Sequence, residues 1–386
     1  MRRAVALLSV LGGCSASTPH SRADAIAVTR SEVLRLPRQR ALPGIAYLQV
    51  GEGGPAMTAT VGATDVAGGP PVTAATMFMA CSMTKVLTAI AVMQLVERGR
   101  IELDAPLSQY LSTQPYGEAV TIRQLLAHTA GIPNPMPVEW FFVEGDPVDR
   151  TEAYRRVLSE HPSLDSRPGD EYAYTNLGYW LLEAVLEASS GQDYEAYLRE
   201  HIFAPLGVPT EAVSFDLPPP ERLAMGHMRR ITFTNLLLRI VAPGRYWLDT
   251  RDGWTRLARV RHWGRGYGGA VMNVAGLGAI VTDLLRRDGR LLGPEAKGRL
   301  FERQEAPAGH PLDATLGWVI GQLDGVPYFG KQGGCLGFQG NLRIYPSIGL
   351  GTVYMANATA VMPGPIDSLS DRLDGPMVRF LASQRP

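Results

Sequence analysis

The stretch "FMACSMTKVLTAIAVMQLVERG", residues 78–99, combines a long apolar run with a serine and a lysine near its start. From Val86 to Val96 the run is apolar nearly all the way round a helix, and Gly99 is a typical helix stop. Such a helix is buried on every side, so its amino end opens into the protein interior. Ser82 and Lys85 are three positions apart, which places their side chains on one face of the helix.

The Ser82 and Lys85 pair has the composition of a reactive centre. A serine hydroxyl must lose its proton to attack an acyl carbon, and a lysine desolvated by an apolar helix can have a pKa low enough to accept that proton. Arginine cannot act as this base because it stays protonated. The chain uses lysine at only three of its 37 basic positions, and chemistry that arginine cannot perform explains the lysine at position 85. Because Ser-x-x-Lys also occurs by chance, the assignment needs partners elsewhere in the chain.

Both ends of the chain predict strands. Residues 43–66, "PGIAYLQVGEGGPAMTATVGATDV", contain two extended runs joined by a glycine-rich turn. Residues 316–334, "LGWVIGQLDGVPYFGKQGG", and residues 341–357, "NLRIYPSIGLGTVYMAN", each contain two more around a turn. These runs are typical of antiparallel hairpins in one sheet.

The middle of the chain has a different period. Residues 101–206 carry helical periodicity interrupted by proline and glycine. We therefore expect a mixed α/β protein, in which an antiparallel sheet flanked by helices is formed by residues 25–100 and 266–386. A mostly helical region, residues 101–265, is inserted between these two parts.

The end of that insertion, residues 228–265, is rich in arginine and tryptophan. It holds nine arginines against two aspartates and three of the six tryptophans. Arginine interleaved with apolar residues is compatible with a lid that admits an apolar acyl group, or with a surface that rests on an anionic membrane. A packed helical hairpin with a solvated face is the third interpretation, and the sequence leaves all three open.

Two further motifs supply candidate partners for the serine. In "DEYAYTNLGYW", Tyr174 can carry a proton when a neighbouring cation lowers its pKa, and Asn176 can orient substrate or lysine by hydrogen bonds. In "FGKQGGCLGFQG", Lys331, Gln332 and Gly333 lie on a predicted strand, where the lysine can attract a carboxylate and glycine lets the backbone approach a ligand. Each motif alone is more often a packed tyrosine with a capping asparagine, or an exposed strand lysine.

Together and in this order, the three motifs resemble the serine β-lactamase and penicillin-binding superfamily. The likeness is greatest to the branch that holds class C β-lactamases, D-alanyl-D-alanine peptidases and related serine esterases. "GRIELDAPLSQYL", "TIRQLLAHTAGIP" and "YGGAVMNVAGLGAIVTDLL" extend the resemblance over residues 42–357. It implies a β-lactamase or transpeptidase-like fold.

The resemblance also implies a role for each residue. Ser82 would be the acylated nucleophile and Lys85 its proton acceptor or electrostatic partner. Tyr174 would be the general acid and base, and Asn176 would orient the lysine and the substrate carbonyl. The backbone amides of Ser82 and Gly334 would form the oxyanion hole. The family's mechanism uses no metal or cofactor.

One departure from the family concerns substrate recognition. Where β-lactam-active members usually have threonine or serine between the lysine and the glycine, this chain has Gln332 between Lys331 and Gly333. The change puts recognition of a β-lactam or peptide carboxylate in doubt, while the catalytic step is less affected. Lys331, Gln332 and Gly333 therefore remain candidate substrate-binding residues.

These observations predict a serine hydrolase that works through an acyl-enzyme, with a carboxylesterase for small or medium acyl esters as the first hypothesis. A β-lactamase or D-alanyl-D-alanine peptidase is the second. A non-turnover binding or sensor protein and an acyltransferase are further alternatives. Acidic and basic residues balance at 37 each, so nothing recruits nucleic acid, and the expected partner is a small ester or amide. The sequence leaves the oligomeric state open.

The amino terminus, "MRRAVALLSVLGGCSAS", resembles a bacterial lipoprotein signal, residues 1–14, ending at a lipidated Cys14. It implies the cell envelope or periplasm and membrane anchoring through Cys14; a cytoplasmic start is the alternative. The internal cysteines, Cys81 and Cys335, imply no disulfide framework and are expected to be small buried residues near the site.

Overall fold

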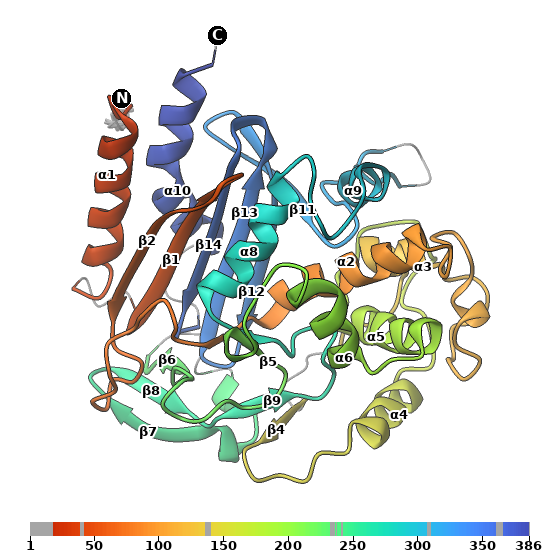
Figure 1. Cartoon of the computed structure of the whole chain (residues 1–386). Coiled ribbons are helices and arrows are strands. Elements are labelled where there is room, and N and C mark those ends of the chain that lie inside the picture. Colours follow the sequence, from red (N-terminus) through yellow and green to blue (C-terminus); the bar gives the residue numbers. More distant parts are fainter. Residues whose placement is uncertain are drawn as a thin grey trace, which may run out of the picture.

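The computed structural model describes residues 18–38, 42–135, 140–231, 236, 238–240, 242–306, 310–359 and 366–385. Its main element is a six-stranded antiparallel sheet with the strand order β11-β12-β13-β14-β1-β2 (Figure 1). As the sequence predicts, both ends of the chain supply these strands. They are β1 (Gly44–Gly51), β2 (Gly54–Gly62), β11 (Val319–Leu323), β12 (Val326–Cys335), β13 (Phe338–Tyr345) and β14 (Leu350–Ala356).

Helices cover both faces of this sheet because successive side chains of a strand point to opposite faces. On β1, Tyr47 packs in a cluster with Val33 of α1 and Leu373 of α10, whereas its neighbour Leu48 packs in the large cluster that contains α2 and α8. No helix in the described part of the chain is both long and apolar enough to cross a membrane. The helices of these layers are α1 (Arg22–Arg35), α2 (Thr84–Glu97), α8 (Val274–Leu285), α9 (Pro294–Phe301) and α10 (Ile366–Ser383).

The inserted region begins with helices and ends with short strands. Its helices are α3 (Ile122–Ala127), α4 (Arg150–Glu160), α5 (Asn176–Ser190) and α6 (Tyr194–Leu198). Its strands are β4 (Phe141–Val143), β5 (Val213–Ser214), β6 (His227–Arg229), β7 (Trp247–Arg251), β8 (Trp254–Leu257) and β9 (Val260–His262). In the described part of the chain they form the small sheets β4-β9 and β6-β8-β7, and β5 pairs with β10 (Val271–Met272), which also pairs with β3 (Phe78–Met79). The expected mixed α/β fold with an antiparallel sheet and a mostly helical insertion is confirmed.

The arginine- and tryptophan-rich segment, residues 228–265, is not the packed helical hairpin considered from its sequence. Its described residues mainly form the antiparallel ladder β6-β8-β7 and the strand β9, with α-helical residues at 236 and 238–240 and a single 3-10 turn at Gly244–Tyr246. The two neighbouring strands differ in exposure. Trp254 and Thr255 of β8 are buried, while most of β7 is exposed, so the segment is a β-ribbon whose inner strand packs on the protein and whose outer strand faces solvent.

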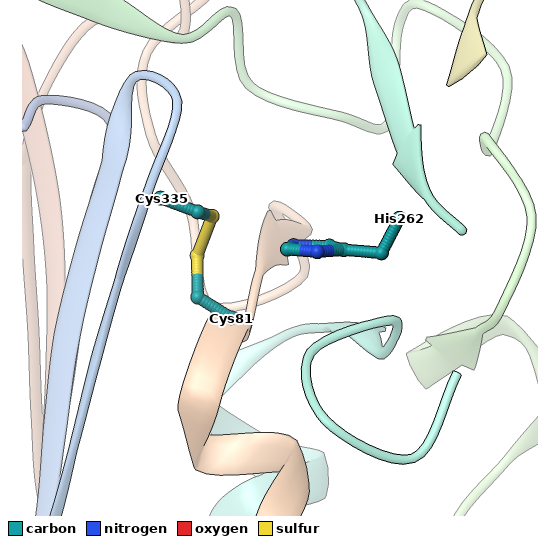
Figure 2. A group of neighbouring side chains, drawn as sticks. All are labelled: Cys81, His262 and Cys335. Atoms are coloured by element: carbon teal, nitrogen blue, oxygen red, sulfur yellow. A yellow bond between two sulfur atoms is a disulfide. The ribbon is translucent and has the colours of Figure 1, made fainter. Parts of the chain in front are cut away.

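A disulfide joins Cys81 to Cys335 and links the start of α2 to the end of β12 (Figure 2). The expectation that these cysteines are only small buried residues is therefore wrong. Their Cα atoms lie 5.8 Å apart although 254 positions separate them in the chain, and that separation concealed the pairing. The bridge fixes the two segments that carry the first and third sequence motifs.

Candidate active site

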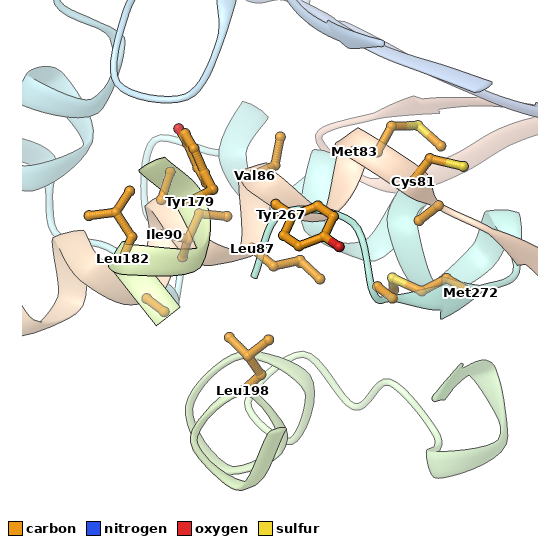
Figure 3. Close-up of a cluster of buried hydrophobic side chains, with 14 of the residues drawn as sticks. Cys81, Met83, Val86, Leu87, Ile90, Tyr179, Leu182, Leu198, Tyr267 and Met272 are labelled. Atoms are coloured by element: carbon orange, nitrogen blue, oxygen red, sulfur yellow. The ribbon is translucent and has the colours of Figure 1, made fainter. Parts of the chain in front are cut away.

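Ser82 is presented by the buried helix α2. It lies on the short turn η1 (Cys81–Met83), which leads directly into that helix. The side chains of α2 are buried from Thr84 to Leu95, as the apolar sequence predicts. Ile90 packs in one cluster with Tyr179 of α5 and other side chains around the helix (Figure 3). The serine therefore sits on a rigid element with its hydroxyl at the edge of the core.

Four residues singled out from the sequence meet at this hydroxyl. Ser82 Oγ lies 2.7 Å from the Tyr174 hydroxyl and 3.3 Å from Lys85 Nζ. Lys85 Nζ donates hydrogen bonds to Asn176 Oδ1 at 2.8 Å and to the Tyr267 carbonyl oxygen at 2.7 Å. The structure thus brings a nucleophile, an amine and a phenol within hydrogen-bonding reach of one another.

The geometry around Lys85 suits a neutral amine. Burial lowers the pKa of Lys85 well below its ordinary value, and the charge of Lys331 lowers it further. A neutral amine has two hydrogens and one lone pair. Asn176 and Tyr267 accept the two hydrogens, so the lone pair is directed toward Ser82 Oγ. Lys85 is therefore arranged to accept the serine proton.

Tyr174 is suited to donating a proton rather than to acting as a phenolate. Burial raises the pKa of Tyr174, and the hydrogen bond with Ser82 offsets only part of that rise. The expectation that a neighbouring cation lowers its pKa is therefore wrong, because the loss of solvation is the largest effect and raises it. Its hydroxyl stays protonated and also donates to Asn176 Oδ1 at 3.2 Å.

Asn176 owes its orientation to the start of α5. Thr175 caps this helix, since its side-chain oxygen accepts from Gly178 N at 3.2 Å. The Asn176 backbone amide donates to Asn134 Oδ1 at 2.9 Å. Because Thr175 is the cap, the Asn176 amide oxygen is left to accept from Lys85 and Tyr174.

The third motif lies on β12, beside the nucleophile. Lys331 is 4% exposed, and its Nζ lies 5.5 Å from the centre of the Tyr174 ring. Burial lowers the pKa of Lys331 to about 7. Gln332 is half-buried. A Cβ on Gly333 would come 2.3 Å from the Ala80 carbonyl oxygen, so only glycine lets the strand approach η1 this closely.

A cavity of about 250 Å³ opens beside Ser82. Ser82 and Gly334, whose amides were assigned to the oxyanion hole, both line it, as does Asn176. Most of the exposed lining is apolar, and none of the described residues that line it is a lysine, arginine, aspartate or glutamate. Its large apolar walls come from Phe141, Met228, Leu238, Tyr267 and Leu336.

The Tyr267 carbonyl was not identified from the sequence, because a backbone acceptor leaves no residue signature. The loop that presents it is fastened to α5 and to the start of α6 by Arg265, which forms ion pairs with Glu183 of α5 at 3.3 Å and with Asp193, the N-cap of α6, at 2.7 Å. Gly266 N also donates to Glu183 Oε2 at 2.8 Å. This loop thereby fixes one of the two acceptors that orient Lys85.

His128 supports Tyr174 rather than the serine. Its ring lies 4.6 Å from the Tyr174 ring, and its Nδ1 accepts from Thr175 N at 3.3 Å. Burial lowers the pKa of His128 well below its ordinary value, so the ring is neutral. It helps hold the loop before α5 in place.

The Beta-lactamase family model matches residues 27–373, which is most of the chain. The protein belongs to this family. The resemblance of its three motifs to the serine β-lactamase and penicillin-binding superfamily is thereby confirmed. Membership supports a serine hydrolase or D-alanyl-D-alanine-peptidase-like activity.

Relatives of this β-lactamase-family chain are named as penicillin-binding proteins. Penicillin-binding protein 4 of Amycolatopsis lactamdurans is 27% identical over 75% of this chain and 74% of its own length. Penicillin-binding protein 4* of Bacillus subtilis is 25% identical over 65% of this chain, and the match spans only 53% of the Bacillus protein. The D-amino acid amidase from Ochrobactrum anthropi SV3 shares the fold with a TM-score of 0.76 at 20% identity, over 94% of this chain and 100% of the amidase.

Proposed function

We propose that the protein is a carboxylesterase that forms an acyl-enzyme on esters with small or medium apolar acyl groups. The observation that carries this proposal is the apolar cavity beside Ser82, whose described lining has no permanently charged side chain. An acyl chain can fill such a cavity without leaving a charged group unpaired. The neutral ester group would remain at the polar edge, near Asn176 and Gly334.

The proposed reaction follows from the hydrogen bonds around the serine. Lys85 accepts the proton of Ser82 as Oγ attacks the ester carbonyl, and the amides of Ser82 and Gly334 stabilise the oxyanion. The bond to the leaving alkoxide breaks, and the Tyr174 hydroxyl supplies the proton with which the alcohol departs. Water then attacks the acyl-serine and gives a proton to the Tyr174 oxygen. Lys85 returns its proton to Ser82 Oγ as the acyl bond breaks, and a carboxylic acid is released.

The position of Lys331 supports an uncharged substrate. To bind a carboxylate this side chain would have to reach the cavity as an ammonium ion. Instead it is buried beside Tyr174, is absent from the cavity lining, and has a pKa lowered to about 7 by burial. Its contribution would be to depress the pKa of Lys85.

Hydrolysis of a β-lactam or a D-alanyl peptide is the second candidate. The order of the three motifs and the names of the relatives favour it. A binding or sensor protein that acylates without turnover, and an acyltransferase, use the same first step. Their outcomes differ only in the fate of the acyl group, so measurement of deacylation separates them from an esterase.

The deciding experiment compares turnover of p-nitrophenyl esters with opening of a chromogenic cephalosporin, with Ser82→Ala as the blank. We expect Ser82-dependent ester turnover and little cephalosporin loss. Two extra methylenes buried in the cavity contribute about 1.6 kcal/mol, so the butyrate ester should exceed the acetate ester about tenfold in kcat/KM. Faster opening of the cephalosporin, or equal turnover by Ser82→Ala, would reject the proposal.

We also propose that Cys14, which lies outside the described residues, anchors the protein in the cell envelope. The lipoprotein-like sequence that precedes it supports this location. Detergent-phase partitioning of membranes from expressing cells tests it. The wild type should enter the detergent phase and Cys14→Ser should not; retention of Cys14→Ser in that phase would refute lipid anchoring.

A further inference from the structure

Three side chains from distant parts of the chain converge at one wall of the cavity. Cys81 lies on η1, Cys335 ends β12, and His262 ends β9 (Figure 2). Their sulfur and ring-nitrogen atoms lie within 4.8 Å of one another, and all three residues line the cavity beside Ser82. Two sulfurs and an imidazole are the donors that zinc and similar soft divalent ions prefer.

His262 is a polar side chain in mostly apolar surroundings. It is 7% exposed, and neither ring nitrogen has a hydrogen-bond partner among the described residues. Its ring packs instead against Phe141, with ring centres 4.6 Å apart, and Tyr267, at 5.2 Å. Since neither ring nitrogen is engaged by these residues, the imidazole has a free lone pair, which a metal ligand requires.

We propose that Cys81, Cys335 and His262 form a binding site for a thiophilic divalent cation such as Zn²⁺ once a dithiol has reduced the disulfide. The reductant transfers two electrons and two protons to the sulfurs and becomes a cyclic disulfide itself. The two thiols then release their protons to solvent as the cation binds. Two thiolates neutralise the charge of the ion, so the complete site can remain in an apolar cavity.

The required movements are small. In a tetrahedral zinc site the sulfurs lie about 3.8 Å apart, and each lies about 3.6 Å from the nitrogen, given Zn–S and Zn–N bonds of about 2.3 and 2.05 Å. Opening the disulfide lets the sulfurs separate to that spacing. The sulfur–nitrogen distances, which are now within 4.8 Å, need to shorten by about 1 Å, and rotation of the side chains can supply this movement. The cavity leaves the fourth position to water.

An ion at this place would inhibit acylation. Cys81 directly precedes Ser82, and Cys335 directly follows Gly334. Each thiolate would therefore lie next in the chain to a residue whose backbone amide is assigned to the oxyanion hole. The ion and its water would occupy the part of the cavity next to the nucleophile. The site would therefore be closed to metals in the oxidised protein and inhibitory in the reduced one.

The test uses the full chain with Cys14→Ser, so that only two thiols remain. The protein is reduced with dithiothreitol, freed of reductant without air, checked for folding by circular dichroism, and titrated with Co²⁺. We expect one equivalent of Co²⁺ with the visible bands of a tetrahedral site and thiolate charge-transfer absorption. Zn²⁺ should displace it, and the oxidised protein should show neither feature. This readout does not depend on hydrolase activity.

Two variants give the assay its specificity. His262→Ala should weaken Co²⁺ binding at least about 100-fold, because loss of a ligand costs more than the loss of a second-sphere partner. His201→Ala, which changes a histidine outside the cavity, should bind as tightly as the parent protein. Unaltered binding by His262→Ala, no tetrahedral spectrum in the reduced parent, or loss of folded structure on reduction would each overturn the proposal. Inhibition of ester turnover by Zn²⁺ only after reduction would place the ion beside Ser82.

Discussion

Replacing Tyr174 with phenylalanine removes one oxygen atom from the site and leaves its packing in place. The lost hydroxyl lies 2.7 Å from Ser82 Oγ and donates to Asn176 Oδ1 at 3.2 Å. Neither partner is left alone, because Lys85 Nζ still contacts both. With two hydrogen bonds lost, the free energy of unfolding should fall by about 1–2 kcal/mol.

The effect on catalysis should be much larger. A positioned general acid contributes about 10²–10⁴-fold, which corresponds to about 2.7–5.4 kcal/mol in activation free energy. Since the raised pKa of Tyr174 keeps its hydroxyl protonated, the loss falls on the proton transfers that accompany acylation of Ser82 and the step with water. We therefore expect kcat for p-nitrophenyl butyrate to fall at least about 100-fold, with a smaller change in KM.

Stopped-flow measurement of the nitrophenolate burst, with mass spectrometry of the acylated serine, separates the two steps. Tyr172→Phe is the matched control, because this tyrosine lies on the same loop, is 38% exposed and contacts His128 rather than Ser82. It should retain at least half of the wild-type rate. If Tyr174→Phe stayed within about threefold of the wild type, with an unchanged burst, the hydroxyl would have no part in proton transfer.

Three further predictions follow from the site. Lys85→Arg replaces the neutral amine with a permanent cation that has no basic lone pair, so kcat should fall about 10²–10⁴-fold, whereas Lys297→Arg outside the site should stay fully active; survival of Lys85→Arg would refute a neutral amine base. Gly333→Ala forces β12 away from η1 and should lower the unfolding free energy by about 1–3 kcal/mol and kcat at least tenfold, as measured by urea unfolding and ester turnover. The pKa of His262 is lowered from its ordinary value of 6.5 to about 3 in the folded protein. The unfolded chain therefore takes up a proton more readily at this residue, so the free energy of unfolding should fall by about 2 kcal/mol from pH 7 to pH 5. His262→Phe should remove that part of the pH dependence, and an equally steep dependence in the variant would contradict the assignment.

The local motifs show which features of the fold and the site the sequence predicts by itself. The apolar period of α2 fixes that this helix is buried, and the spacing within it places Lys85 beside Ser82, because three positions make about one helical turn. Alternating and turn-rich runs at both ends predict the antiparallel sheet. The order of the three motifs indicates the family. The buried helix, the Ser82–Lys85 spacing and each hairpin of the sheet depend on interactions close along the chain, so the sequence alone determines them.

The tertiary structure decided what depends on residues far apart. It paired Cys81 with Cys335 across 254 positions, and it made the Tyr267 carbonyl an acceptor for Lys85. It also buried Lys331 away from the cavity lining and gave the His262 ring no polar partner among the described residues. Burial lowers the pKa of Lys331 and of His262, and burial is a property of the packed neighbours on every side. The residues that gather around the serine could therefore be predicted from the sequence, whereas the charge state and the shape of the site were decided only by packing.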